Sequence, residues 1–288
     1  MKKFKCALIS DNHLGYTKNT FRILEIFFEK LAKENIDILF IAGDEISHNQ
    51  DQFERFYKLV RKFLPDIKIY STKGNHSLWH KNGTLPSMPW DSDPFISVDY
   101  NFFYRTRGRL PSYKQPMSYG RMKIAHDEVY KKYNIIHLDG TSHELTENIV
   151  VMGFDGWYNE VNLAKLGTND YRYMPEMIES APSHVYLRNK AEKDLEKLLD
   201  TPTEGKTVIM MTHFPPFSDR GDEVWNANPR FMNFITEKCD YLFVGHSHRQ
   251  CDFVENGCRV INAGIDETVL HLKGRYDKPR YVVFELEG

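Results

Sequence analysis

Residues 37–44 read DILFIAGD, an apolar run that is bounded by Gly43 and followed by an aspartate. A run of this length without polar interruption is typical of a strand buried on both faces, as in a parallel sheet. The stretch therefore predicts an interior strand, with the side chain of Asp44 placed just beyond its end.

Similar runs lie on both sides of this strand, at residues 5–10 and 67–72. Between the three runs lie two segments with the apolar spacing of a helix, the first at about residues 20–33 and the second ending at Pro65. The apolar positions are Leu24, Phe27, Phe28 and Leu31 in the first segment, and Phe53, Phe56, Tyr57 and Val60 in the second. The alternation predicts a βαβαβ unit, and so a parallel sheet with right-handed crossovers.

Residues 78–145 interrupt this regular pattern, because they are rich in Pro, Ser, Gly and aromatic residues. A connection of about 70 residues within a compact domain is usually functional. We therefore expect a single domain over residues 1–288, in which residues 78–145 form an inserted cap with one helix at 119–133. The other expected elements are a strand at 149–154, a helix at 183–199, strands at 208–212 and 241–244, a hairpin with strands around Phe253 and at 258–263, and a strand at 280–287.

The composition favours a globular protein and excludes some functional classes. The chain has 288 residues, of which 41% are hydrophobic and 27% charged, and its formal net charge is −2. This balance speaks against a protein coated in positive charge for non-specific DNA binding. No long apolar stretch follows the charged N-terminus, so we expect no membrane segment and a cytoplasmic location.

The four cysteines fit neither a metal-binding spacing nor a dense disulfide framework. Asn256-Gly257 predicts a two-residue hairpin turn. This turn pairs Glu255 with Cys258 and Cys251 with Asn262, so Cys251 and Cys258 lie too far apart to form a bridge. We expect four reduced thiols.

Five short polar motifs, each after an apolar strand-like run, carry the functional information. They are Asp11-Asn12-His13, Gly43-Asp44, Gly74-Asn75-His76, Thr212-His213 and Gly245-His246-Ser247-His248. Open α/β sheets bind ligands beyond the carboxyl ends of their strands, which is where the first three motifs fall. A lone Asp or His at such a position is more often structural than functional, but the joint pattern reverses that expectation.

The motifs supply the ligands that Mn²⁺, Fe or Zn²⁺ prefer, and the absence of cysteine disfavours a structural zinc site. One ion accepts at most six ligands, so seven candidates imply two divalent ions, with Mn²⁺ as the expected metal and Fe or Zn²⁺ as the alternatives. Asp44 is the natural bridge, since a carboxylate has two oxygens. The seven candidate ligands are Asp11, His13, Asp44, Asn75, His213, His246 and His248.

In their residues and their order, these motifs resemble those of the calcineurin-like metallophosphoesterase superfamily. The opening Asp11-Asn12-His13-Leu14-Gly15 is most similar to the nuclease branch that includes Mre11 and SbcD. The resemblance implies an α/β fold, a four-layer αββα sandwich, and a His76 that acts as the catalytic general acid. It also implies that Asp11, His13, Asp44 and His248 hold one ion, and that Asp44, Asn75, His213 and His246 hold the other.

Two residues depart from the family pattern. Ser47 stands where the second motif of the family usually has Asp, and Ser77 stands where an acid usually follows the histidine of the third motif. Neither position supplies a metal ligand in the family pattern. In many members the acid after the histidine orients it, so the orientation of His76 is the feature that these departures affect.

The middle segment combines positive charge with aromatic rings, and no acidic residue occurs from Tyr100 to His126. Such a segment suits the binding of phosphates and stacked bases. The same composition is also expected of a cap whose aromatic residues form its own small core. We expect the substrate-binding side chains to include Arg105, Arg107, Arg109 and Tyr113.

Together these features predict a phosphoesterase that hydrolyses a phosphomonoester or phosphodiester, with a nucleotide-type substrate, through a hydroxide that bridges two metal ions. The alternatives are a DNA nuclease of the Mre11 and SbcD type, which would bind nucleic acid, a protein serine/threonine phosphatase, and an inactive metal-binding interaction module. The 40 residues after His248 leave little space for a further DNA-binding domain, which disfavours the nuclease.

Overall fold

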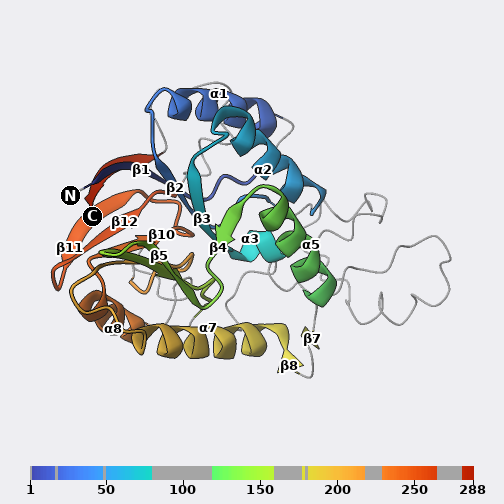
Figure 1. Cartoon of the computed structure of the whole chain (residues 1–288). Coiled ribbons are helices and arrows are strands. Elements are labelled where there is room, and N and C mark those ends of the chain that lie inside the picture. Colours follow the sequence, from blue (N-terminus) through green and yellow to red (C-terminus); the bar gives the residue numbers. More distant parts are fainter. Residues whose placement is uncertain are drawn as a thin grey trace.

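A computed structural model describes residues 2–16, 19–47, 50–79, 119–158, 177–178, 181–217, 229–264 and 281–288. Its described part contains two large β-sheets that face each other, with helices on both outer sides (Figure 1). This arrangement confirms the expected αββα layers.

The first sheet contains the expected βαβαβ unit. Its strand order is β13-β1-β2-β3-β4, in which β1 to β4 are parallel and β13 pairs with β1 in the antiparallel direction. Because β1, β2 and β3 are parallel, their carboxyl ends meet at one edge. The strands are β1 (Lys3–Ile9), β2 (Ile38–Ala42), β3 (Lys68–Thr72), β4 (Ile135–His137) and β13 (Val282–Glu287).

The second sheet has the strand order β11-β12-β10-β9-β6-β5. Its β6, β9, β10 and β12 run parallel to one another, while β5 and β11 are antiparallel edge strands. The strands are β5 (Thr141–Thr146), β6 (Ile149–Gly153), β9 (Thr207–Met211), β10 (Tyr241–Val244), β11 (Cys251–Glu255) and β12 (Cys258–Asn262). The short strands β7 (Met177–Ile178) and β8 (Ala181–Pro182) pair separately.

The hairpin of β11 and β12 has the predicted register. Glu255 pairs with Cys258, and Cys251 pairs with Asn262. All four cysteines are free thiols. Two cysteines lie close together, but they are not the pair in this hairpin. The Sγ atoms of Cys239 and Cys258 are 3.5 Å apart.

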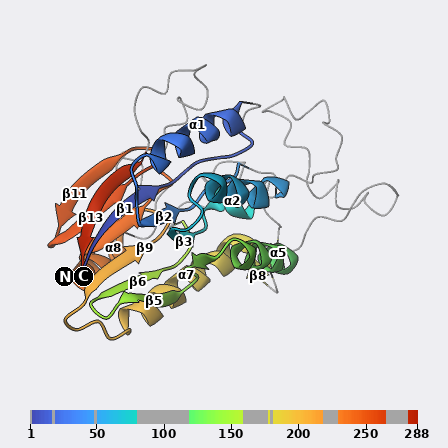
Figure 2. The same cartoon turned by 45° about the horizontal axis from the view of Figure 1, so that its top comes forward.

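Helices form the two outer layers. Figure 1 places α1 and α2 on one side of the molecule and α7 and α8 on the other, and Figure 2 shows α5 beside α2. Within the described residues, no helix is long and apolar enough to cross a membrane. The helices are α1 (Thr20–Ala32), α2 (Asp51–Phe63), α3 (Asn75–Leu78), α5 (Tyr119–Lys132), α7 (Ser183–Leu199) and α8 (Arg230–Lys238).

The alternation of side chains along each strand explains why both faces of each sheet are buried. On β1, Ala7 and Ile9 pack against the helices of the first outer layer. Cys6 and Leu8 belong to the core between the two sheets, which also includes Met211 from β9. Neighbouring Met210 packs in the core that α7 and α8 cover. Three apolar cores therefore separate the four layers.

Part of the expected insertion belongs to these layers. Within residues 78–145, β4 lies in the first sheet, β5 lies in the second, and α5 covers the first sheet beside α2. Residues 80–118 lie outside the described residues. The boundaries of a cap therefore stay a prediction.

Candidate metal centre

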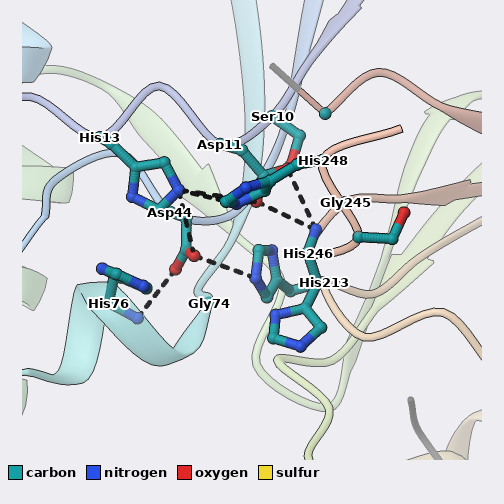
Figure 3. Close-up of polar contacts among 12 residues, drawn as sticks. Ser10, Asp11, His13, Asp44, Gly74, His76, His213, Gly245, His246 and His248 are labelled. Carbon is teal, nitrogen blue, oxygen red and sulfur yellow. Dashed lines mark hydrogen bonds and ion pairs between the residues drawn. The ribbon is translucent and has the colours of Figure 1, made fainter. Parts of the chain in front are cut away.

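Six of the seven expected ligands, all except Asn75, form clusters at the edge where the parallel strands of both sheets end (Figure 3). Three strands of the first sheet and two strands of the second lead into the centre. Asp11 and His13 follow β1, Asp44 follows β2, Asn75 begins α3 after β3, His213 follows β9, and His246 and His248 follow β10. The sequence separations reach more than 200 residues, so the fold itself assembles this cluster.

Two groups of possible ligand atoms share the carboxylate of Asp44. The first group is Asp11, His13, Asp44 and His248, and the second is Asp44, His213 and His246; within each group, all ligand atoms lie within 4.8 Å of one another. The first group has the same residues as one set that the family resemblance implied, and the second has those of the other set except Asn75; the assignment of ions to them stays a prediction. Asn75 is buried at the start of α3, and the N–H of the next residue, His76, donates to Asp44 Oδ1 at 2.9 Å.

The interatomic distances fit ligands that converge on a cation. The Nε2 atoms of His13 and His248 lie 3.0 Å apart, and His248 Nε2 lies 3.2 Å from Asp11 Oδ1. Two ligand atoms that are each about 2.1 Å from one ion lie about 3 to 4 Å from each other. Among the described residues, the buried Asp44 Oδ2 atom accepts no hydrogen bond, although His213 Nε2 lies 3.3 Å away. This donor set and its spacing suit a divalent ion.

The backbone turns sharply at the ligands. Among the described non-glycine residues with positive φ, five of eight are candidate ligands: Asp11 (57°), His13 (44°), Asp44 (55°), His246 (66°) and His248 (56°). This conformation is unfavourable for residues with a side chain and persists only where the surroundings impose it. Such residues concentrate at functional sites, which supports a functional reading of the cluster.

The motif glycines allow the ligands to pack closely. A Cβ atom on Gly74 would lie 2.1 Å from Asp44 Oδ1 and 2.6 Å from His213 Nε2. A Cβ atom on Gly245 would lie 1.9 Å from Ser10 Oγ and 2.8 Å from Asp11 Oδ2. The side chains of both sheets can therefore meet only because these positions have none.

Backbone carbonyl groups orient two of the imidazoles. His213 Nδ1 donates to the carbonyl oxygen of Ala42 at 2.7 Å, and His76 Nδ1 donates to that of Ser47 at 2.7 Å. A carbonyl oxygen can only accept, so Nε2 is the nitrogen left for chemistry in each ring. In the family pattern an acidic side chain often orients this histidine, and Ser77 stands at its position. Here the main-chain carbonyl group of Ser47 orients His76 instead.

The electrostatics of the site favour cation binding. Burial alone would raise the pKa of the Asp11 carboxyl, but the nearby imidazoles of His248 and His213 together lower that pKa to about 2. Burial lowers the pKa of His246 to about 3. Burial would also lower the pKa of His213, but Asp44, Asp11 and the hydrogen bond to Ala42 together raise that pKa to about 9. The centre therefore offers ionised carboxylates and a neutral His246, and a cation would displace the proton of His213.

Sequence reasoning assigned no metal-binding or catalytic role to two carboxylates near the ligands. Glu45 is fully buried directly after Asp44, and Asp155 follows β6 and accepts hydrogen bonds from the Lys73 amide at 2.7 Å and from His137 Nε2 at 3.1 Å. Burial would raise the pKa of Asp155, but the nearby His137, Lys73 and Lys190 together lower that pKa. The only sequence signal for Glu45 and Asp155 is that each is a charged residue close to the end of an apolar strand. The expected substrate-binding residues Arg105, Arg107, Arg109 and Tyr113 lie outside the described residues.

Comparisons with known proteins agree with this geometry. The family model described as calcineurin-like phosphoesterase matches residues 4–250. The DNA double-strand break repair protein Mre11 of Methanopyrus kandleri is 30% identical over 94 residues, which cover 28% of this chain and 21% of that protein. The match thus spans about a fifth of the length of this curated relative.

Solved structures show the same fold at low sequence identity. The phosphopantetheinyl hydrolase PptH of Mycobacterium tuberculosis is 13% identical, with a TM-score of 0.63 over 97% of this chain and 95% of that chain. A dimetal phosphatase from Danio rerio is also 13% identical, with a TM-score of 0.50 over 90% of this chain and 86% of that chain. At this identity the likeness establishes the layered fold alone.

Proposed function

The chain belongs to the calcineurin-like phosphoesterase family, and from this premise we propose that it is a hydrolase with two metal ions that cleaves a phosphomonoester or phosphodiester of the nucleotide type. The proposal concerns the reaction, the number of ions and the substrate class. Mn²⁺ is the proposed metal, with Fe and Zn²⁺ as the alternatives.

One observation carries the proposal. Two groups of buried carboxylate and imidazole atoms meet at Asp44, and each group is compact enough for one ion. In the proposed site Asp11, His13, Asp44 and His248 hold one ion, and Asp44, Asn75, His213 and His246 hold the other. Two such ions would make a hydroxide nucleophile available at neutral pH and would neutralise charge on the phosphoryl oxygens.

The residues of the chain have separate tasks in this proposal. The carboxylates and imidazoles that hold the ions also fix the position of the phosphoryl group. His76 acts as the general acid in its doubly protonated form, in which Nδ1–H donates to the Ser47 carbonyl and the Nε2 proton passes to the leaving oxygen, which leaves a neutral imidazole. Its ring lies beside His13, with 4.4 Å between the ring centroids, so it borders the ligand group.

The nucleotide preference is supported by the sequence between the third and fourth motifs. Residues 100–126 carry basic and aromatic side chains without any acidic one, which suits a phosphate with an attached base. In this proposal Arg105, Arg107, Arg109 and Tyr113 contact the substrate.

A second candidate function is cleavage of the DNA backbone. It is favoured by the 94-residue stretch that is 30% identical to an Mre11 protein. Both candidates use the same centre, so only the size and form of the substrate distinguish them.

The test is a Mn²⁺-dependent hydrolysis screen over cyclic, linear and dinucleotide phosphates, single-stranded DNA and a generic aryl phosphodiester. EDTA and the Asp44→Ala variant serve as controls. We expect hydrolysis of nucleotide substrates that EDTA abolishes, and an Asp44→Ala protein with no activity and lower metal content, because that change removes the shared ligand.

Faster cleavage of single-stranded DNA than of any nucleotide would favour the nuclease. No hydrolysis of any substrate, with Mn²⁺ bound, would instead indicate a metal-binding module without enzymatic activity. Two ions still bound to Asp44→Ala would disprove the bridging role of Asp44.

A further inference from the structure

Glu45 is a fully buried carboxylate that takes no part in the proposed ligand set. Three hydroxyl groups contact it: those of Tyr57 (2.7 Å) and Ser71 (3.1 Å) at Oε1, and that of Ser77 (2.5 Å) at Oε2. None of the lysines and arginines in the described part of the chain hydrogen-bonds to it. A buried carboxylate without a cationic partner is costly for stability, so Glu45 needs another explanation.

The contact with Ser77 connects Glu45 to the first turn of α3. Ser77 Oγ donates to Glu45 Oε2 and accepts the backbone N–H of Gly74 at 3.2 Å. Gly74 is the residue before α3. A side chain in the third position of a helix that accepts this N–H satisfies one of the donors that the helix leaves open at its start. Glu45 therefore fixes the hydroxyl that caps α3.

The residues around Glu45 hold α3 at two further points. Asp44 Oδ1 accepts the backbone N–H of His76 at 2.9 Å, and the carbonyl oxygen of Ser47 accepts His76 Nδ1 at 2.7 Å. Asn75 and His76 lie between Gly74 and Ser77, so these contacts together determine where both side chains point. The segment 44–47 thus serves as the support on which α3 rests.

We propose that Glu45 is a positioning residue, whose carboxylate sets the place of Asn75 and His76 by fixing α3 through Ser77. This inference rests on the proposed function in so far as those two residues act in phosphoester hydrolysis. It assigns a role to a residue that neither binds metal nor touches the reacting atoms.

The geometry suggests an exchange experiment. Because Ser77 Oγ lies 2.5 Å from Glu45 Oε2, a longer acidic side chain at position 77 would reach the space that the Glu45 carboxylate fills. A glutamate in the third helical position can also accept the N–H of the residue that precedes the helix. The double variant Glu45→Ser/Ser77→Glu therefore returns one carboxylate to the same place, carried by α3 in place of the residue that follows Asp44.

The experiment compares Glu45→Ser, Ser77→Glu and the double variant with the wild-type protein. Asp240→Asn is the control, because Asp240 is likewise a carboxylate that holds a neighbouring segment, through the N–H of Val208 at 2.7 Å, but at the opposite end of the second sheet. The first measurement is kcat and KM for an aryl phosphodiester with Mn²⁺. The second is the ¹⁵N-histidine NMR spectrum of the metal-free proteins, in which the Nδ1 proton of His76 is assigned by its loss in His76→Ala.

We expect Glu45→Ser to lower kcat about 10- to 100-fold with little change in KM, since a displacement of about 1 Å can cost that much. The NMR signal of the His76 Nδ1 proton, which its hydrogen bond to Ser47 protects from exchange with water, should weaken in the same variant. Ser77→Glu should also lose activity, because it brings two carboxylates together. The double variant should recover both kcat and the His76 signal, whereas Asp240→Asn should lose stability only.

An unchanged His76 signal and unchanged kcat in Glu45→Ser would overturn the inference while leaving the proposed function intact. Failure of the double variant to recover either quantity, although it folds, would also overturn it, because the position of the carboxylate would then not matter. If the wild-type protein hydrolyses nothing, the proposed function fails, and the His76 signal alone decides the role of Glu45.

Discussion

Gly74 shows how a single missing side chain can determine whether the candidate metal centre forms. Its backbone conformation is extended (φ −104°), so alanine fits the main chain, but the added Cβ would lie 2.1 Å from Asp44 Oδ1 and 2.6 Å from His213 Nε2. We expect Gly74→Ala to displace the shared carboxylate and to lower metal affinity by at least about tenfold, a change of about 1.4 kcal/mol. Isothermal titration with Mn²⁺ measures this effect.

Gly120 provides the matched control for this substitution. It lies in α5, and a Cβ atom there meets nothing within 4 Å. Gly120→Ala should leave metal affinity unchanged and stabilise the protein by about 0.5 to 1 kcal/mol, because alanine favours helix. Equal metal affinity in both variants would mean that the close approach at Gly74 has no effect on binding.

Residues of the centre differ in how far sequence could predict them. The residue types and spacing of Asp11, His13 and His248 predict that they lie together, and their possible ligand atoms do lie within 4.8 Å of one another. Glu45 was not predictable, because its environment consists of Tyr57 from α2, Ser71 from β3 and Ser77 from α3, which only the folded chain brings together. The carbonyl of Ser47, which orients His76, belongs to the main chain and has no sequence signature.

At the scale of elements, regular periodicity gave the most reliable predictions. The expected helix at 183–199 is α7 (Ser183–Leu199), and the Asn256-Gly257 turn fixed the register of β11 and β12. The strand β4 escaped prediction, because three residues (Ile135–His137) are too few to show a period. The contact of Cys239 with Cys258 joins the end of α8 to β12, so no local pattern could indicate it.

The apolar face of α7 allows a stability prediction at this scale. Leu187, Ala191, Leu195 and Leu198 are buried in the core that the helix covers, whereas Glu196 is exposed. Leu195→Ala should lower the free energy of unfolding by about 2 to 5 kcal/mol. The reason is that Leu195 has only 2% of its surface exposed, so the shorter side chain leaves a cavity in the core. Urea titration monitored by circular dichroism measures the change.

The control for α7 is Glu196→Ala, which should change the free energy of unfolding by less than about 0.5 kcal/mol. Metal content should stay at the wild-type level in Leu195→Ala, because α7 packs on the outer face of the second sheet. A loss of metal from that variant at a temperature where it is folded would show that the outer layer affects the centre directly.

At the scale of the whole molecule, the candidate centre is a connection between the two sheets. Asp11 and Asp44 extend from strands of the first sheet, and His213, His246 and His248 extend from strands of the second. Across this boundary, His248 Nε2 lies 3.2 Å from Asp11 Oδ1, and His213 Nε2 lies 3.3 Å from Asp44 Oδ2. An ion that both sheets coordinate would bind the folded chain only, since the unfolded chain does not bring these residues together.

Metal binding should therefore raise the thermal stability of the entire chain. A ligand at about 100 times its Kd stabilises the folded state by about 2.7 kcal/mol, which for a protein of this size corresponds to a rise in Tm of roughly 5 °C. Differential scanning calorimetry with Mn²⁺ and with EDTA measures this shift. In Asp44→Ala the shift should nearly vanish, because the carboxylate shared by both ligand groups is gone. A full shift in that variant would mean that Mn²⁺ stabilises the protein from another site, and that the two sheets do not need a common ion at this edge.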